Sequence, residues 1–262
     1  MLINKFWKKN QLHIIYRHVA STALSAPSKD RPDWFSHEKC FINLLHTLKL
    51  SHPSDLRVEL HVLFDGDQKS YETDFIQKHI DIFNYSQSGN PNRLHLKIFK
   101  GGSQALAMHF ALNYIEECHF SDHDYVYLLE NDYLHQNNWI HELSDLLGSQ
   151  IPFDYISLYD HYDKYPFHKG FHEMHHNLTS NLFVTKGRHW RTTPSSCATF
   201  ITSMKTFRAD RVILGSGLMD HLMFDELTKL GRVVVSPIPS LSTHCMTRFL
   251  APCINWIDSQ GK

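Results

Sequence analysis

The sequence predicts an α/β fold in a single domain, with a mainly parallel sheet flanked by helices. Three observations lead to this prediction. Short apolar runs typical of strands alternate with longer segments whose apolar residues recur at helical spacing. Such alternation forms parallel, doubly wound sheets, because each helix returns the chain to the same edge of the sheet. The 262 residues contain no linker and no internal repeat, and one α/β core of that size is ordinary.

The first half of the chain contains four strand–helix pairs. In one of them, Ser36 can cap a helix whose apolar stripe includes Leu44 and Leu48. The fourth strand is almost continuously apolar, as expected for a strand that is covered on both faces. The predicted strands span 12–16, 57–64, 94–99 and 124–129, and the predicted helices span 36–50, 73–83, about 102–118 and 138–147.

The second half of the chain is less regular. A polar, aromatic and turn-rich stretch at 160–177 is interpreted as a long loop over the functional site. We expect strands at 155–159, 181–185 and 232–235, and helices at about 197–208 and 218–230.

Composition and charge restrict the possible functions. With 26 Lys and Arg against 27 Asp and Glu, the net charge of -1 gives no support for a nucleic-acid partner. The five cysteines are scattered without a CxxC pair, which favours reduced thiols and a cytoplasmic location. Because the chain has 21 histidines, any one histidine is weak evidence of function.

Neither a membrane span nor a secretory signal is predicted. No apolar run reaches the roughly 18 residues of a spanning helix, and the first residues lack the apolar core of a signal peptide. Basic and aromatic residues at 5–9 allow at most a peripheral contact with a membrane, and a solvated terminus is the plainer interpretation.

Four carboxylates follow two of the predicted strands. Asp65 and Asp67 come after the second strand, and Glu130 and Asp132 come after the fourth. The carboxyl ends of parallel strands meet at one edge of a sheet, where the ligands of such folds bind. The sequence therefore predicts an acidic site at that edge.

The stretch 101–143 resembles the donor-binding core of GT-A glycosyltransferases, particularly family two. A glycine-led helix is followed by a strand that ends in a DxD-like motif, and a further helix begins a few residues later. The motif reads Glu130-Asn131-Asp132, with Glu in place of the first Asp, and the glycine-led helix lacks the Arg-Asn pair common in the family. The likeness covers about 12–145 and implies a Rossmann-like GT-A fold.

The resemblance implies transfer of a sugar from a nucleotide-sugar to a glycan or another hydroxyl acceptor. A UDP-sugar is the first candidate for the donor. Residues of about 10–148 would bind the donor, and residues of about 149–262 would shape the acceptor side. A divalent cation, Mn²⁺ or Mg²⁺, held by Glu130 and Asp132 would stabilise the charge of the leaving diphosphate. His244 resembles the C-terminal histidine that several GT-A enzymes add as a metal ligand, and such a mixed ligand set favours Mn²⁺.

Further donor contacts are expected at the same edge. Asp65, and with less support Asp67, stand where the family commonly has an aspartate against the nucleotide, although an ordinary turn also explains them. Arg17 and His18 follow the first predicted strand, and an arginine there can pair with phosphate. Asn131, inside the acidic motif, completes the predicted donor set.

Two aspartates in the second half are candidates for the catalytic base. An inverting transferase needs a carboxylate that deprotonates the acceptor hydroxyl. Asp220, 90 residues after Glu130, resembles the family's catalytic-base motif, although acids at helix amino ends are common for structural reasons. Asp160, in the loop after a predicted strand, is the competing base.

Two other functions remain open. The run His172-Glu173-Met174-His175-His176 satisfies H-E-x-x-H, the signature of zinc peptidases, but a glycine precedes it closely and no third ligand follows. The chain could also be a non-catalytic GT-A-like module that binds a nucleotide or a glycan.

Overall fold

The computed structural model describes residues 11–20, 30–52, 56–86, 93–166, 173–175 and 177–258. Its strands are β1 (Gln11–Val19), β2 (Arg57–Asp65), β3 (Arg93–Phe99), β4 (Tyr125–Glu130), β5 (Tyr133–His135), β6 (Tyr155–Ile156), β7 (Leu182–Val184), β8 (His189–Thr193), β9 (Phe200–Ser203), β10 (Val234–Ile238) and β11 (Ser242–His244). Its α-helices are α1 (His37–Leu50), α2 (Gln68–Glu72), α3 (Phe75–Ser86), α4 (Gln104–Glu117), α5 (Trp139–Leu147), α6 (Met204–Ala209), α7 (Arg211–Leu214) and α8 (Asp220–Lys229). Short 3-10 turns are η2 (Tyr162–Lys164), η3 (Glu173–His175) and η4 (Thr247–Phe249).

The described strands form a nine-stranded sheet in the order β3-β2-β1-β4-β9-β6-β10-β8-β7 and a two-stranded sheet of β5 and β11. The four strands from the first half of the chain are all parallel. β9 lies antiparallel between β4 and β6, and β8 and β7 extend the sheet antiparallel beyond β10. The predicted α/β fold is confirmed, although the second half makes the sheet mixed rather than mainly parallel.

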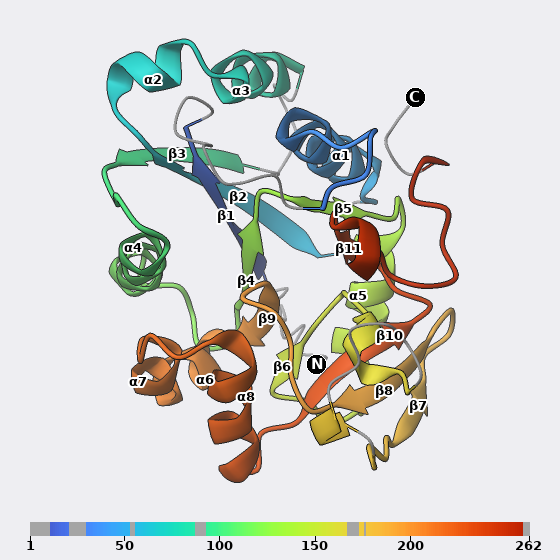
Figure 1. Cartoon of the computed structure of the whole chain (residues 1–262). Helices are drawn as coiled ribbons and strands as arrows, with labels where there is room; N and C mark the ends of the chain where they lie inside the picture. The colour runs from blue at the N-terminus through green and yellow to red at the C-terminus, as the bar shows by residue number, and fades with distance from the viewer. Residues whose placement is uncertain are drawn as a thin grey trace, which may run out of the picture.

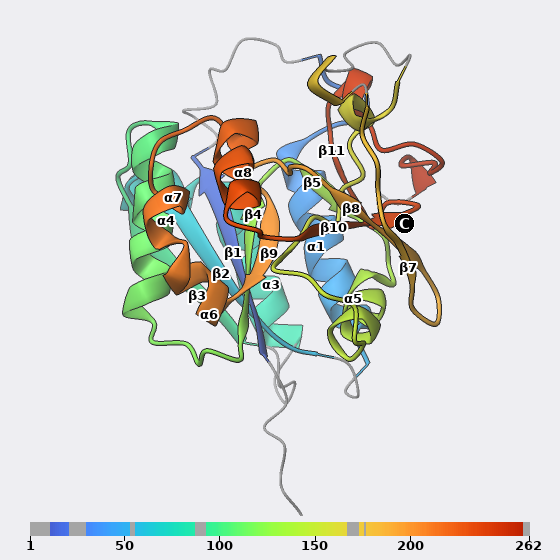
Figure 2. The same ribbon diagram turned by 90° about the horizontal axis from the view of Figure 1, so that it is seen from below.

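Helices cover both faces of the large sheet (Figures 1 and 2). α1, α3 and α5 lie on one face, and α4, α6, α7 and α8 lie on the other. Adjacent residues of β1 therefore enter different cores: Ile14 packs in the cluster that contains Phe41 of α1, whereas Ile15 packs in the cluster that contains Leu112 of α4. This burial on both faces explains the continuous apolar runs of the sequence.

One predicted helix is wrong. The segment 197–208 forms β9 first and α6 afterwards. Phe200 and Ile201 are fully buried in opposite cores, and β9 pairs with both β4 and β6. Pairing with distant strands thus outweighs the local helical spacing. The Ser203 side chain then accepts a hydrogen bond from the Thr206 amide and caps α6.

The predicted helix 73–83 corresponds to α3, and the short helix α2, which was not predicted, precedes it. The Asp67 carboxylate caps α2, and the Asp74 carboxylate accepts a hydrogen bond from the Ile76 amide at the start of α3. The short strands β5, β8 and β11 were not predicted, because strands of three to five residues show little periodicity.

None of the described helices is long and apolar enough to cross a membrane. Residues 5–9, for which at most a peripheral membrane contact is predicted, lie outside the described residues. His172 and His176 of the H-E-x-x-H run also lie outside them, and the residues 173–175 form a single 3-10 turn. The five cysteines are free thiols.

Candidate active site

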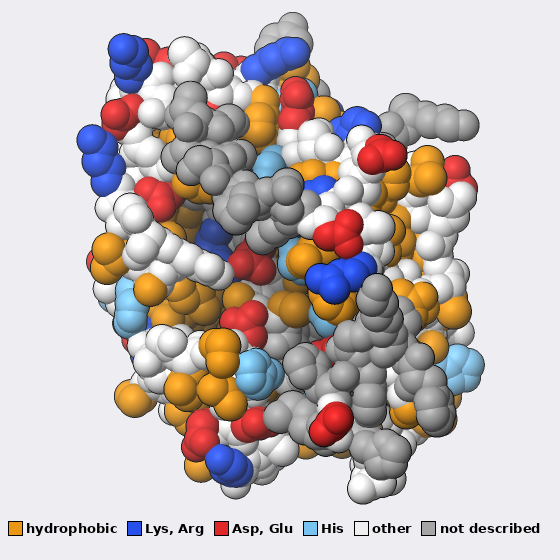
Figure 3. Space-filling model, in the orientation of Figure 1, with side chains coloured by type: hydrophobic (Ala, Val, Ile, Leu, Met, Phe, Trp, Pro, Cys, Tyr) orange, Lys and Arg blue, Asp and Glu red, His pale blue; other side chains and the backbone are white. Residues whose placement is uncertain are grey.

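The carboxyl ends of β1, β2 and β4 open on one edge of the large sheet, which faces the viewer in Figure 1. Acidic side chains gather in a hollow in the middle of this face, as Figure 3 shows. Four titratable residues meet here from β4, the turn after it, α8 and β11, namely Glu130, Asp132, Asp220 and His244. The charges of the other three all influence the pKa of Glu130.

The small sheet brings His244 to Asp132. β11 pairs with β5 so that His244 lies opposite Tyr133, and the two rings stack with centroids 5.1 Å apart. The His244 Nε2 atom then lies 3.0 Å from Asp132 Oδ2, although 112 residues separate the two. Only 4% of Asp132 is exposed. The structure thus joins two of the three predicted metal ligands.

Arg31 approaches the same carboxylate. Its Nη2 atom donates to Asp132 Oδ2 at 2.6 Å, and its Nη1 atom donates to the Cys245 carbonyl at 2.6 Å. Burial alone would raise the pKa of Asp132, but the charges and hydrogen bonds of His244 and Arg31 outweigh it and hold that pKa well below its usual range. Asp132 is therefore ionised at neutral pH and lies between two cationic or potentially cationic groups.

Glu130 lies beside Arg17. The two side chains approach to 3.4 Å, and Arg17 also donates to the Ala198 carbonyl at 3.3 Å. The Thr199 hydroxyl contacts the Glu130 carboxylate at 3.4 Å and accepts from the Glu130 amide at 3.2 Å. Burial raises the pKa of Glu130, the Arg17 charge opposes the rise, and the Asp132 charge adds to it.

Asp220 is the first residue of α8. Its carboxylate accepts a hydrogen bond from the Ala198 amide at 2.9 Å. Burial raises the pKa of Asp220, with the Ala198 bond and the Arg17 charge opposing it. The residue also lines a cavity of about 150 Å³ together with Tyr159 and Lys164. Asp220 thus combines an elevated pKa with a position at the wall of a cavity.

Asp160 is placed differently. It is 2% exposed, accepts a hydrogen bond from Arg191 at 2.6 Å, and accepts another from the Tyr165 hydroxyl. Asp160 is not among the residues that line the cavity beside Asp220. Because both of its oxygens are already bonded, Asp160 is less suited than Asp220 to receive a proton from a bound acceptor.

The two acids after β2 differ in their surroundings. Asp65 is half-buried, and its carboxylate accepts from the Gly101 amide at 2.7 Å. A Cβ atom at Gly101 would lie 2.5 Å from Asp65 Oδ2, so the glycine permits this contact. Asp67 is exposed and caps α2 by accepting from Ser70. Asp65 is therefore fixed against the segment after β3, whereas Asp67 has a structural role that needs no ligand.

His18 and Asn131 lie behind the acidic turn. His18 is 1% exposed, with Nε2 3.3 Å from Asp74 and Nδ1 3.2 Å from the Asn131 side-chain amide. The Asn131 carbonyl is 3.1 Å from His37 Nδ1. These contacts fix the backbone between Glu130 and Asp132, so both residues position the acidic turn in this structure.

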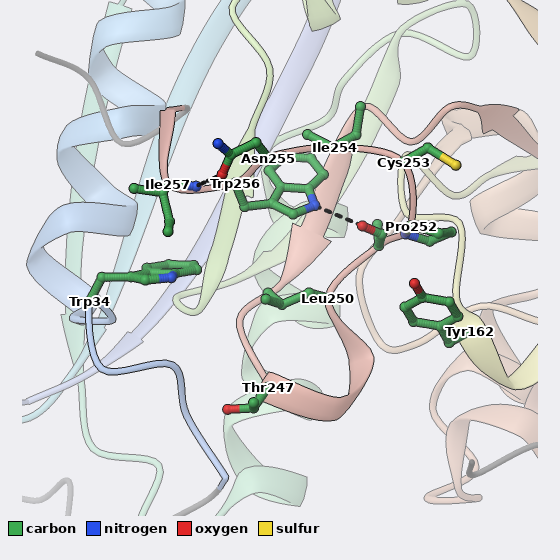
Figure 4. Close-up of a pocket in the computed structure, with 11 residues that line it drawn as sticks. Trp34, Tyr162, Thr247, Leu250, Pro252, Cys253, Ile254, Asn255, Trp256 and Ile257 are labelled. Atoms are coloured by element: carbon green, nitrogen blue, oxygen red, sulfur yellow. Dashed lines mark hydrogen bonds between the residues drawn. The ribbon is translucent and has the colours of Figure 1, made fainter. Parts of the chain in front are cut away.

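A second cavity lies along the C-terminal segment (Figure 4). It has a volume of about 310 Å³, and its lining includes Trp34, Tyr162, Leu250 and Trp256. The Trp256 ring is fixed by a hydrogen bond from Nε1 to the Ala251 carbonyl at 2.9 Å. Trp34 follows Arg31 by three residues, so the segment that carries Arg31 to Asp132 also borders this aromatic cavity.

Several groups of the molecule could not be identified from the sequence. Arg31 and Thr199 stand in segments without a pattern that distinguishes them. Within the part of the chain that the structure describes, the group with metal-ligand spacing is His13, Glu59 and His61, whose ligand atoms all lie within 4.8 Å of one another. His13, Glu59 and His61 lie inside predicted strands. The sequence shows only that Glu59 and His61 share one face of a strand, because their positions alternate, and this alone does not indicate a metal site.

No protein-family model matches the sequence. No curated protein matches it. Solved structures similar to this chain include residues 1–349 of TarS from S. aureus, with 12% identity and a TM-score of 0.42 over 77% of this chain and 49% of that one. The chain thus spans about half the length of that structure.

Two further similar structures cover nearly the whole chain. The inositol-1-phosphate CTP transferase from T. maritima has 10% identity and a TM-score of 0.42, over 96% of this chain and 94% of that one. A nucleoside-diphosphate-sugar pyrophosphorylase from Vibrio cholerae RC9 has 11% identity and a TM-score of 0.43, over 95% and 99%. The residues of the site itself therefore carry the functional assignment.

Proposed function

We propose that the protein is a metal-dependent, inverting glycosyltransferase. It moves a sugar from a nucleotide-sugar, with a UDP-sugar as the first candidate, to a hydroxyl acceptor. One observation carries the proposal: Glu130, Asp132, Asp220 and His244 converge with Arg17 at the carboxyl edge of the parallel strands. Ligands of open α/β sheets bind at that edge. The resemblance of the 101–143 segment to donor-binding cores supports the same assignment.

The donor set fits a divalent cation. The Asp132 carboxylate and the His244 imidazole lie 3.0 Å apart and offer the oxygen and nitrogen ligands that suit Mn²⁺. Glu130 is further from them and would act through water. When bound, the cation supplies positive charge to the leaving diphosphate.

Two guanidinium groups would also stabilise the negative charge of the leaving diphosphate. Arg17 and Arg31 pair with Glu130 and Asp132 in this structure and can turn toward phosphate oxygens when a donor binds. Asp65, held by the Gly101 amide, would accept hydrogen bonds from the nucleoside.

Asp220 would activate the acceptor. The acceptor oxygen bonds to the anomeric carbon while its proton passes to the Asp220 carboxylate, and the bond from that carbon to the diphosphate oxygen breaks with its electron pair. The raised pKa of Asp220 favours this proton transfer. The cavity of about 150 Å³ beside Asp220 offers room for the acceptor hydroxyl, and the aromatic cavity with Trp34 and Tyr162 offers a surface for a sugar ring.

A donor screen tests the proposal. The protein is incubated with UDP-, GDP- and TDP-sugars, with and without Mn²⁺, and release of the nucleoside diphosphate is measured. Mn²⁺-stimulated release from one donor class is expected, with loss in Asp132→Asn and retention in the matched exposed control Asp122→Asn. Binding without turnover would instead favour a non-catalytic module. Release of pyrophosphate from a nucleoside triphosphate with a sugar phosphate would contradict sugar transfer.

A further inference from the structure

A patch of polar residues lies near the amino ends of β1 and β2, at the opposite end of these strands from the acidic site. Its side chains face the interior of the protein. His13 pairs in register with Glu59, and His61 follows Glu59 at the next position on the same face of the sheet. This face is covered by α4, whose Tyr114 reaches the patch. His13 precedes Arg17 by four residues, which is about 13 Å along a strand. The patch is therefore separate from the acidic site.

The three ligand atoms are spaced for a metal ion. His13 Nδ1 lies 3.2 Å from His61 Nε2, and Glu59 Oε2 lies 3.7 Å from the former and 3.9 Å from the latter. A circle through these three atoms has a radius of about 2.1 Å, the usual length of a zinc–nitrogen or zinc–oxygen bond. An ion near the centre of this triangle would reach all three without rearrangement of the strands.

Neighbouring groups orient the three side chains. The Tyr114 hydroxyl is 2.9 Å from His61 Nδ1, which leaves Nε2 directed at the centre of the triangle. On the far side of His13, Nε2 lies 3.9 Å from the Asp124 carboxylate. Arg57 pairs with the other oxygen of Glu59 at 3.4 Å. Groups that engage the distal atoms of ligands in this way are a regular part of metal sites.

The two imidazoles are buried within the patch. His13 and His61 are each 3% exposed. His95 stacks on His61 with centroids 4.5 Å apart, has Nε2 3.4 Å from Glu59 Oε2, and is 42% exposed. The His95 side is thus the open side of the patch.

We propose that His13, Glu59 and His61 bind a transition-metal ion, zinc in the first place, at the amino edge of β1 and β2. Two imidazole nitrogens and one carboxylate oxygen form a three-residue ligand set, and water from the His95 side completes a tetrahedral site. The ion cross-links two adjacent strands and neutralises the buried Glu59 carboxylate. This inference does not depend on sugar transfer, because no residue is shared with the acidic site.

Zinc titration in the Asp132→Asn background tests the site, since that change disables the other candidate metal position. One zinc ion per chain is expected, and Co²⁺ in its place should give the intense visible absorption of a four-coordinate site. His61→Phe should abolish both signals, and Glu59→Gln should weaken zinc binding at least about 100-fold. The exposed His123→Asn change serves as the control and should leave both signals intact.

The outcomes are distinguishable. Circular dichroism of each variant shows whether it folds, and Glu59→Gln tests the ligand set even where His61→Phe fails to fold. Equal zinc stoichiometry and an unchanged Co²⁺ spectrum in a folded Glu59→Gln or His61→Phe variant would overturn the proposal. Absence of zinc binding in the Asp132→Asn protein would overturn it as well, while leaving the donor screen unaffected.

Discussion

The two ends of the parallel strands carry opposite chemistry. At the carboxyl end, ionised carboxylates lie beside guanidinium groups, as in Asp132 beside Arg31 and Glu130 beside Arg17. At the amino end, two buried imidazoles are neutral and face one carboxylate. The guanidinium groups at the carboxyl end can pair with a polyanionic ligand in place of the carboxylates. The imidazoles at the amino end offer lone pairs to a cation. The two edges of one sheet thus present chemically different groups.

Loss of the Asp132 charge should have the largest effect at the carboxyl end. Asp132→Asn removes a proposed metal ligand and leaves Arg31 and His244 without their counter-charge, so kcat/KM should fall about 1000-fold, equivalent to about 4 kcal/mol. Steady-state turnover of the donor identified by the screen measures this. A decrease of less than tenfold in a folded variant would contradict the metal role.

Asp220→Asn should have the next largest effect. Loss of the proposed base should lower kcat about 100-fold and leave the donor KM nearly unchanged. Because burial raises the pKa of Asp220, activity should be lost as the pH falls through a value above the ordinary aspartate pKa of about 3.9. A pH profile of kcat/KM measures the acid limb. Asp225→Asn on the same helix is the matched control, and equal losses in the two variants would argue against Asp220 as the base.

A neutral imidazole also lies beneath the carboxyl edge, in β5. Burial lowers the pKa of His135 to about 3, and the residue is fully buried against the Tyr127 hydroxyl. The unfolded chain takes up a proton on His135 below about pH 6.5, whereas the folded chain does not, so stability falls as the pH decreases from 6.5 toward 3.

His135→Gln measures this contribution. The difference in unfolding free energy between pH 7 and pH 5, measured by urea denaturation, should be about 2 kcal/mol smaller than in the wild type. The exposed His123→Gln change should leave the wild-type difference unchanged. An unchanged difference in His135→Gln would show that the imidazole is already protonated in the folded protein at pH 5.

Asp67→Ala should have the smallest effect. Asp67 caps α2 through Ser70, so the change should cost about 1 kcal/mol of stability and leave the donor KM unaltered. Thermal denaturation and donor titration measure the two quantities. A clear rise in donor KM without loss of stability would move Asp67 into the donor site beside Asp65.

The first half of the fold could be predicted because its signals are local. β1, β2 and β4 are buried on both faces and the helices on one, so periodicity reveals them, and the acids after β2 and β4 follow from strand ends. The second half depends on distant pairing. β9 is held by β4 and β6, and β11 is a three-residue strand held by β5, so neither has a pattern of its own.

The acids of the candidate site could be predicted from the sequence, whereas Arg31 and the burial of His18 could not. Its acids stand at strand ends or a helix start, which sequence spacing can locate. Arg31 could not be predicted, since its position against Asp132 depends on the path of an irregular segment. The buried state of His18 depends equally on tertiary packing: it lies between Asp74 and Asn131, two residues that are far from it in the sequence.

Ala198 and Thr199 connect residues of the first and second halves of the chain. The Ala198 carbonyl accepts from Arg17, its amide donates to Asp220, and the Thr199 hydroxyl contacts Glu130. A shift of this segment by one residue would withdraw all three contacts together, because alternate residues of an extended chain point to opposite sides. Under the proposed function, a substitution at Ala198 or Thr199 would therefore change donor preference and acceptor preference together, because these two residues between them contact the proposed donor side and the proposed base.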